Sequence, residues 1–397
     1  MKLFKTLLIF SMFSFFNIII YAQDIITREN GDEIQEQLVN PDSVTDRKII
    51  NGNFGDTITP VRFNEEKKVG LKDAEGNIIA SAKYAHIKEF VEGMAAVNLG
   101  GKERVEYQMP PGAGLLYVPI LKIFGGKWGF VNIQGEEIIP CQYEAVESFS
   151  EGMAAVKLKY KCGFIDKTGA QIIPCKYDDV NNFSEGLAVV YSRNRCGFVN
   201  ITGQLVVPCK YEIAESFSEG LAAVRSKFQY GFIDITGKEV IPLKYARAKS
   251  FSEGLAVVSI RNRYGFVDIT GQEVIPLKYE TAESFSEGLA VVKLKNKYGF
   301  VDKTGQEVIP CKYDYVNSFS GGLAVACIGV EVKVKGNEYY TRTNFSGDGK
   351  WGFIDTNGEE VIPLIYNNVE EFKNGKAKVM LEGKTLYINT EGEVLDQ

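Results

Sequence analysis

The stretch "LAVVKLKNKYGFVDKTGQEVIPCKYDYVNSFSGG", residues 289–322, contains the features that predict the fold of this chain. Its first residues alternate, with Ala290 and Val292 on one face and Lys293 on the other, which is the spacing of a β-strand. The aromatic and β-branched run "KYGFVD" predicts a second strand, and "QEVIP" predicts a third. The stretch therefore predicts three short antiparallel strands and no helix.

The residues between these strands predict how the chain turns. Asp302 can accept hydrogen bonds from the backbone ahead of it, and Gly305 can adopt a positive φ, so the two predict a tight hairpin. Pro310 cannot donate to a β-ladder and is expected to end the third strand or to lie on a sheet edge. Tyr313 and Phe319 are expected to pack under a wide return loop. Each such unit is a meander followed by an apolar corner.

The unit recurs along the chain. A Gly-Phe pair begins at residues 129, 163, 197, 231, 265 and 299, so that each step is 34 residues. A unit of this size cannot bury its apolar face alone, and neighbouring units must stack. The predicted fold is all-β, with tandem 34-residue three-stranded antiparallel meander repeats stacked into an open β-solenoid or superhelix. The alternative is a closed β-propeller, although propeller blades usually need four strands and about 40–45 residues.

Two segments resemble a known repeat. "KWGFVNIQGEEIIPCQYEAVESFSEGMAAV" (127–156) and "KWGFIDTNGEEVIPLIYNNVEEFKNGKAKV" (350–379) look like WG (KWG) repeats of bacterial proteins. The resemblance implies an interaction scaffold, and it implies no reaction and no catalytic residues. Five central copies keep the frame but replace the Trp of the repeat, with Cys162, Cys196, Tyr230, Tyr264 and Tyr298.

The expected organisation of the chain has three parts. Residues 1–22 are a signal peptide, 23–58 are a leader or flexible segment, and 59–397 are the repeat array. Copies are expected near 69–97, 127–156, 161–190, 195–224, 229–258, 263–292, 297–326 and 350–379, with a half copy at 386–395 and insertions at 98–126 and 327–349.

The N-terminus predicts export. Lys2 and Lys5 precede an apolar run that ends at Ala22, the pattern of a secretory signal peptide, with an uncleaved membrane anchor as the alternative. We expect an extracytoplasmic protein, in the periplasm, on the cell surface or secreted, with no membrane span after signal cleavage. Loss of Lys2 and Lys5 moves the net charge from −6 to −8. An acidic chain of this kind is a poor nucleic-acid binder.

Seven cysteines in an exported chain raise the question of disulfides. Several follow an Ile-Pro or Val-Pro pair where other copies have Leu, which is typical of a small apolar core position. We therefore expect buried free thiols. The pairs Cys141–Cys162 and Cys175–Cys196 are the only disulfides that we consider.

The search for catalytic residues finds no constellation. His86 is the only histidine, which excludes His-dependent triads and multi-His metal sites, and a surface or packing role is expected for it. Asn132 and Asn200 replace the recurring Asp at the hairpin start, and Asn can form the same turn but cannot act as a general acid. The corner glutamates of "FSEG" are expected to be solvated, and the Lys before each recurring Tyr is expected to pair with the acid two residues on. No catalytic residue, metal site or cofactor is predicted.

The two insertions contain residues that depart from the repeat frame. Both extend the hairpin between the first and second strands of a unit, and insertions in a repeat array often map to the binding face. The alternative is that the apolar insertion caps the stack. The predicted binding residues are Tyr107, Tyr117, Trp128, Tyr339, Tyr340, Phe345 and Trp351.

The sequence therefore predicts an exported, non-enzymatic scaffold or binding protein. Its extended β surface would serve a protein, peptide or glycan partner and no nucleic acid, and we expect a monomer. The rival hypothesis is a cell-envelope hydrolase that acts on glycan or peptidoglycan, with its site in the irregular segments.

Overall fold

The structure is a computed structural model that describes residues 61–65, 68–108, 118–336 and 341–395. The expected signal peptide, residues 1–22, and the leader, residues 23–58, lie outside the described residues. Within the described part every regular element is a β-strand, so the all-β prediction is confirmed. A search of this part for an apolar helix long enough to cross a membrane finds none.

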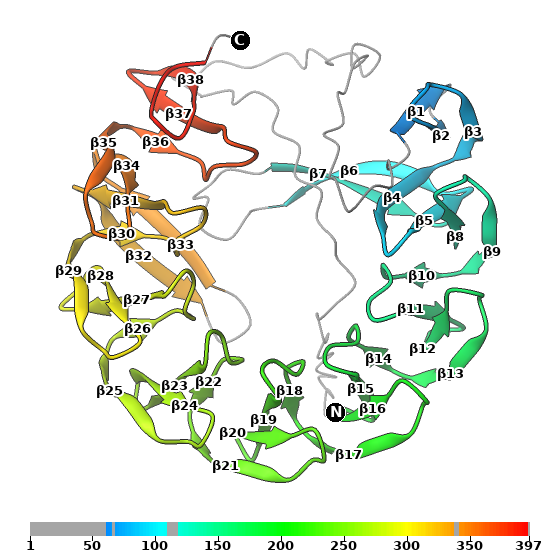
Figure 1. The fold of residues 1–397 in the computed structure, drawn as a ribbon, viewed down its shortest axis with the longest axis horizontal. Coiled ribbons are helices and arrows are strands. Elements are labelled where there is room, and N and C mark those ends of the chain that lie inside the picture. The colour runs from blue at the N-terminus through cyan, green and yellow to red at the C-terminus, as the bar shows by residue number, and fades with distance from the viewer. Residues whose placement is uncertain (1–60, 66–67, 109–117, 337–340, 396–397) are drawn as a thin grey trace, which may run out of the picture. The chain divides into compact units, whose positions relative to one another are not determined.

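The strands form a succession of small antiparallel sheets, each built from strands close in sequence (Figure 1). The described chain divides into two compact units. The strands of the first unit are β1 (Val61–Glu65), β2 (Lys68–Lys72), β3 (Ile78–Tyr84), β4 (His86–Val91), β5 (Met94–Leu99), β6 (Lys102–Gln108), β7 (Val118–Phe124), β8 (Lys127–Asn132), β9 (Glu137–Tyr143), β10 (Ala145–Val146), β11 (Met153–Leu158), β12 (Lys161–Asp166), β13 (Gln171–Tyr177) and β14 (Asp179–Val180).

The second unit, which begins at Phe183, has the same construction. Its strands are β15 (Leu187–Ser192), β16 (Arg195–Asn200), β17 (Leu205–Tyr211), β18 (Ile213–Ala214), β19 (Leu221–Ser226), β20 (Gln229–Asp234), β21 (Glu239–Tyr245), β22 (Arg247–Ala248), β23 (Leu255–Ile260), β24 (Arg263–Asp268), β25 (Glu273–Tyr279), β26 (Thr281–Ala282), β27 (Leu289–Leu294), β28 (Lys297–Asp302), β29 (Glu307–Tyr313), β30 (Tyr315–Val316), β31 (Ala324–Ile328), β32 (Glu331–Gly336), β33 (Thr341–Ser346), β34 (Lys350–Ile354), β35 (Glu360–Tyr366), β36 (Asn368–Val369), β37 (Ala377–Leu381) and β38 (Lys384–Ile388).

Each full sheet contains the predicted meander and one additional strand. In the sheet β26-β27-β28-β29 the last three strands are those predicted from residues 289–322, and the two-residue strand β26 pairs with β27 through Thr281↔Lys293 and Ala282↔Val292. The sheets β10–β13, β18–β21 and β22–β25 have the same order. A two-residue strand is too short to show alternation, so the sequence could not reveal it. No described sheet closes on itself, as expected of an open, solenoid-like stack.

The third strand explains why the repeats keep Gly-Phe. Pro310 lies exposed on β29, which is an edge strand, and this confirms the second of the two alternatives expected for it; the strand continues past the proline to Tyr313. The register between β28 and β29 shifts beside Gly299. A Cβ atom at Gly299 would lie 2.4 Å from the carbonyl oxygen of Ile309 and 2.7 Å from the amide nitrogen of Cys311. Only glycine permits this close approach of two backbones.

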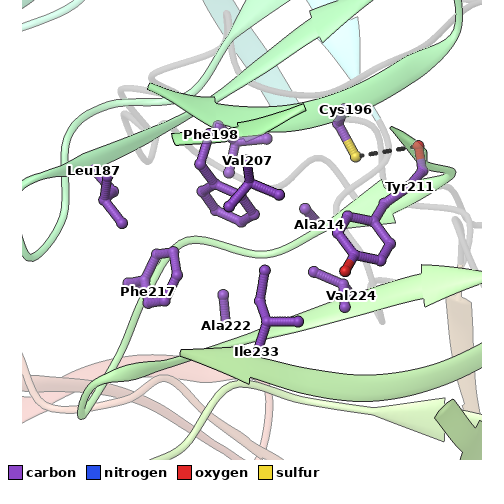
Figure 2. Packing of buried hydrophobic residues seen from close by; sticks show 11 residues of the cluster. Leu187, Cys196, Phe198, Val207, Tyr211, Ala214, Phe217, Ala222, Val224 and Ile233 are labelled. Carbon is purple, nitrogen blue, oxygen red and sulfur yellow. Dashed lines mark hydrogen bonds between the residues drawn. The ribbon is translucent and has the colours of Figure 1, made fainter. Parts of the chain in front are cut away.

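Both faces of a sheet are buried, because each sheet packs between two neighbours. On β27, Ala290 and Val292 join the core shared with the preceding sheet, whereas Leu289 and Val291 join the core shared with the following one. Figure 2 shows an equivalent core of the second unit. There the ring of Phe198 packs with Phe217, and the next sheet adds small and aliphatic side chains, Ala222, Val224 and Ile233.

The corner residues complete these cores. Tyr313 and Phe319 are 1% and 2% exposed, as the sequence predicted, and the ring centroids of Phe300 and Phe319 are 4.7 Å apart. Six or more large side chains meet in each core, so that every repeat depends on its neighbours for burial.

The two insertions form separate two-stranded hairpins. β6 and β7 pair with each other between β5 and β8, and β32 and β33 pair between β31 and β34. The flanking strands still pair directly, with Leu99 opposite Lys127 and Ile328 opposite Lys350. The insertions therefore replace a turn and leave the meander intact.

Candidate functional site

The recurring aspartates at the hairpin start form turns. The amides of Thr304 and Gln306 donate to Asp302 Oδ1 at 2.9 Å each, and the Thr304 hydroxyl donates to it at 2.7 Å. These bonds, the hydroxyl bond above all, hold the pKa of Asp302 below its usual value. Asn200 accepts the same amide bonds, from Thr202 at 3.1 Å and from Gln204 at 2.9 Å. The prediction of a turn role is confirmed.

The corner glutamates link successive repeats, which the sequence did not predict. Glu185 accepts hydrogen bonds from the amides of Glu219 at 2.6 Å and Gly220 at 2.8 Å, one repeat further on. The bonds Gly254 to Glu219, Gly288 to Glu253 and Gly322 to Glu287 repeat this contact. The carboxylates are partly exposed, but their oxygens stabilise the next corner.

The corner serines make a second link in the same direction. The hydroxyl of Ser184 donates to the carbonyl oxygen of Phe217 at 2.8 Å, and the bonds Ser218 to Phe251, Ser252 to Phe285 and Ser286 to Phe319 follow it along the second unit. The Phe, Ser and Glu of "FSEG" therefore each have a structural role.

The acidic residue that follows the recurring Lys-Tyr pair also stabilises a turn. Glu212 accepts hydrogen bonds from the amides of Lys227 at 3.1 Å and Phe228 at 3.3 Å, at the turn between β19 and β20. The expected partner, Lys210, lies instead over the ring of Tyr211, with Nζ 5.0 Å from the centroid. The predicted pairing of lysine with the acid two residues on does not describe this repeat, because the carboxylate turns toward the backbone of the hairpin.

Trp351 and Phe345 lie in an aromatic cluster at the base of the β32–β33 hairpin. The two ring centroids are 5.1 Å apart, and Tyr315 lies 5.0 Å from Phe345 and 5.7 Å from Trp351. Trp351 is 7% exposed, and Phe345 is half-buried against the same core. This cluster fixes the hairpin to the last full sheet. A binding role for the two residues stays a prediction, and Trp351 has little surface with which to meet a partner.

Trp128 occupies the equivalent place in the first unit. It is half-buried, its ring meets His86 edge-on at 6.2 Å, and Lys88 Nζ lies 5.4 Å from its centroid. Lys88 pairs with the buried Glu147 at 3.6 Å. Burial, and then the positive charges of Arg62 and Lys88, lower the pKa of His86 to about 4. His86 is thus a packed, neutral ring, which agrees with the packing role expected for it.

The remaining predicted binding residues cannot be placed. Tyr117, Tyr339 and Tyr340 lie outside the described residues, and for Tyr107 only the backbone, in β6, is described.

Two strongly exposed aromatic side chains escaped the sequence analysis. Tyr160 is 82% exposed and Phe228 is 79% exposed, and each is the second residue of the two-residue turn between the first and second strands. Both have a φ of 62°, which is unusual for a bulky residue. Other copies place Asn194, Asn262 and Asn296 there. The sequence offered one signal for these two residues, because an aromatic residue replaces asparagine at this turn position in two copies.

All seven cysteines are free thiols, as predicted, but only Cys162, Cys196 and Cys327 are buried and the other four are half-buried. Cys175 and Cys196 pack in different cores. Burial raises the pKa of the Cys196 thiol to about 12. Among the described residues, no group of three His, Cys, Asp or Glu side chains is placed to hold a metal ion.

Some partly buried carboxyl groups have raised pKa values. Burial raises the pKa of Asp179 to about 6, against the opposing effects of the Val180 amide and Lys157. Burial also raises the pKa of Glu147, against the charge and hydrogen bond of Lys88, and the charge of Asp179 adds to the rise. Burial raises the pKa of Glu215, which occupies the same position two repeats further on.

Comparisons with known proteins agree with the repeat assignment. The sequence model described as "WG containing repeat" matches residues 70–102, 128–162, 163–196, 197–227, 230–264, 264–298, 298–329 and 351–384. No curated protein matches the chain.

Several solved structures match the chain at low identity and low TM-score. Hsv2 of Kluyveromyces lactis is 10% identical with a TM-score of 0.30, over 72% of this chain and 94% of that one. PorZ of Porphyromonas gingivalis, described as a surface component of the type-IX secretion system, is 10% identical with a TM-score of 0.27, over 79% of this chain and 52% of that one. The extracellular domain of BT4673 from B. thetaiotaomicron is 11% identical with a TM-score of 0.25, over 83% of this chain and 51% of that one.

Proposed function

The chain belongs to the family of WG-containing repeat proteins, and from this premise we propose that it is an exported, non-enzymatic binding or scaffold protein. The observation that carries the proposal is the use of the recurring carboxylates. Asp302, Glu212 and Glu185 represent three of the recurring acidic positions, and each accepts backbone hydrogen bonds that hold a turn or join two repeats. Export rests on the signal-like N-terminus.

The partner is a protein, peptide or glycan that meets the array at its inserted hairpins. These hairpins replace plain two-residue turns and are held at their bases. In β5 the buried Asn98 accepts a hydrogen bond from the Gly101 amide at 2.9 Å and donates one to the Gly125 carbonyl at 3.2 Å. A fixed base presents the rest of a hairpin at a defined place, which lowers the entropic cost of binding.

The test replaces a hairpin by the turn that it interrupts. Substituting Asn-Gly for residues 100–126 joins Leu99 to Lys127, which already pair. We expect this variant to keep its β-type circular dichroism and to lose the partner captured by crosslinking in the native host. The matched control replaces Glu382-Gly383, the plain turn between β37 and β38, with Asn-Gly and should capture normally. Capture undiminished by loss of the hairpin would refute its binding role, and a lost fold would show that the segment is a structural cap.

A second candidate function is a hydrolase that acts on glycan or peptidoglycan of the cell envelope. One observation favours it, because a carboxyl group with a pKa of about 6, as for Asp179, suits a general acid. Purified protein should show no turnover on peptidoglycan or on polysaccharides if the chain is a binding protein. Turnover that disappears in Asp179→Asn would establish the hydrolase instead.

A further inference from the structure

Four of the five two-residue turns between the first and second strands of the second unit share an unexpected composition, and the fifth, Glu382-Gly383, does not. Each of the four begins with an exposed cation, and another basic residue directly follows three of them. We call this set the turn surface: residues 193–195, 227–229, 261–263 and 295–297. It contains the cations Arg193, Arg195, Lys227, Arg261, Arg263, Lys295 and Lys297 and no acidic residue, in a chain whose net charge is −6.

Turn conformation does not explain these cations. The first turn residue has a φ of 50° in Arg193, Lys227 and Arg261, and of 51° in Lys295. Turns with a positive φ at both central residues favour Asn, Asp and Gly, not Lys or Arg. The cations therefore lie at positions where the backbone would accept other residues at lower cost.

These turns all lie at one end of their sheets. In β27 and β28 the turn follows Leu294, whereas the corner Gly288 and the hairpin at Asp302 lie at the opposite end, since Leu289 pairs with Asp302. The bonds from Glu185 to Gly220 and from Glu253 to Gly288 join corner to corner along the unit. Because the corners are aligned, the turns are aligned at the other end. Cations then recur at about the 10 Å spacing of packed sheets.

Nearby acids neutralise only part of this charge. Arg195 pairs with Glu212 at 3.5 Å, and Lys297 pairs with Asp314 at 2.5 Å. Glu212 binds the backbone amide, not the side chain, of Lys227. Glu280 likewise accepts a hydrogen bond from the Asn296 amide. The side chains of Lys227, Arg261 and Lys295 are exposed, which leaves a row of positive charge over these three turns.

Phe228 adds an aromatic platform to the row. The Arg225 guanidinium, which is 8% exposed, lies 5.9 Å from the Phe228 centroid and 5.7 Å from the Tyr230 centroid, and Arg225 pairs with Glu212 at 3.4 Å. The ring of Phe228 thus rests on a buried cation with most of its surface in water. Most of this ring is exposed, in a turn whose backbone favours asparagine. Tyr160, after Lys159 in the first unit, is likewise exposed with a φ of 62°.

We propose that the turn surface binds an anionic polysaccharide, with its carboxylates on the turn cations and one sugar ring stacked on Phe228. The proposal rests on the proposed function, since it names a partner class and a surface for the same binding protein. A linear polyanion with a charge on each sugar meets cations spaced about 10 Å apart without a special register. The apolar face of a pyranose matches a single flat ring, whereas an acidic peptide gives no reason for a supported aromatic at this turn.

The experiment measures binding of the full chain to three polymers: polygalacturonate, poly-L-glutamate and neutral dextran. We expect polygalacturonate to bind, with an affinity that falls as salt rises, and the other two to bind at least tenfold more weakly. Phe228→Asn, which installs the residue of the other turns, should keep the fold and weaken polygalacturonate binding about five- to tenfold. Lys227→Gln combined with Arg261→Gln should weaken it and flatten its salt dependence. The control, Lys238→Gln, removes an exposed cation from the opposite end of a sheet and should change nothing.

The outcomes separate this inference from the proposed function. No binding of polygalacturonate, equal binding of poly-L-glutamate, or indifference to Phe228→Asn would each overturn the polysaccharide proposal. Hairpin-dependent capture of a protein in the native host would survive those results and uphold the proposed function. Cleavage of polygalacturonate by the protein would refute a non-enzymatic function. It would still support binding of an anionic polysaccharide at the turn surface.

Discussion

At the scale of single residues, the corner glutamates combine an unfavourable backbone with a favourable side chain. Glu253 has a φ of 55°, a region that costs a non-glycine residue about 1 kcal/mol. Its carboxylate accepts the Gly288 amide at 3.0 Å and pairs with Lys303 at 3.1 Å. These contacts compensate for the strain, so the same side chain is retained at corner after corner.

This balance predicts an order of stabilities. Glu253→Ala keeps the strained φ and loses the contacts, so we expect a loss of about 1–2 kcal/mol in the free energy of unfolding. Glu253→Gly also loses the contacts but relieves the strain, and should cost about 0.5–1 kcal/mol less than Ala. Urea unfolding of the variants checks the order, and faster hydrogen exchange at Gly288 checks the location. Equal stabilities for Ala and Gly would show that the backbone is not strained.

His86 predicts a dependence of stability on pH. Its pKa is about 4 in the fold and about 6.5 when unfolded, so the unfolded chain binds the proton more readily between these values. Its contribution is fully present above pH 6.5 and is lost as the pH falls toward 4, by at most about 3 kcal/mol. Urea unfolding of His86→Gln against the wild type at pH 7 and pH 4.5 isolates this effect, because all other groups titrate in both. A difference between the two proteins that does not change with pH would exclude a buried, neutral His86.

At the scale of the strands, the sequence could predict the three long strands and the hairpin of a repeat better than the short fourth strand and the contacts between repeats. Alternation, Gly305 and Asp302 were sufficient for three strands and a hairpin, because these signals are local. The strand β26 is only two residues long, and the bond from Glu253 to Gly288 joins residues 35 apart, so neither leaves a local pattern. The exposed Phe228 was visible only by comparing copies at one turn position.

The Gly-Phe glycine makes a prediction at this scale. A Cβ at Gly231 would lie 2.5 Å from the Ile241 carbonyl oxygen and 2.8 Å from the Leu243 amide nitrogen. Gly231→Val should therefore force β20 from β21 and destabilise that repeat and its neighbours by several kcal/mol. Hydrogen exchange should rise there and remain unchanged several repeats away. Gln229→Val, on the exposed start of the same strand, is the matched control, and a uniform rise across the chain would contradict nearest-neighbour coupling.

At the scale of the whole molecule, stability comes from a series of similar cores. Each is built from two sheets, as with Phe198 and Phe217 on one side and Val224 on the other. The sequence predicted this arrangement because a repeated apolar frame leaves no other way to bury it. It could not predict what the array binds, because a partner is recognised by departures from the frame.

The strand assignment predicts the spectrum of the molecule. Circular dichroism of residues 23–397 should show a β-type spectrum with almost no helical signal, since every described element is a strand. The measurement should be repeated on Glu253→Ala as a control that the spectrum follows the fold. A substantial helical component would contradict the repeat architecture.

The forward-pointing bonds of the corners give the array a direction. The bonds of Ser184 and Glu185 run to the next repeat, so each copy offers one kind of surface to its successor and a different kind to its predecessor. A gene duplication that inserts one whole repeat adds a corner glycine, whose amide donates to the glutamate of the preceding repeat. It also adds a corner glutamate, which accepts the amide of the following repeat. The number of repeats can then increase or decrease while the contacts between repeats stay the same. Gly321, which stands where Glu287 and its equivalents have a carboxylate, marks the last link of this chain of bonds.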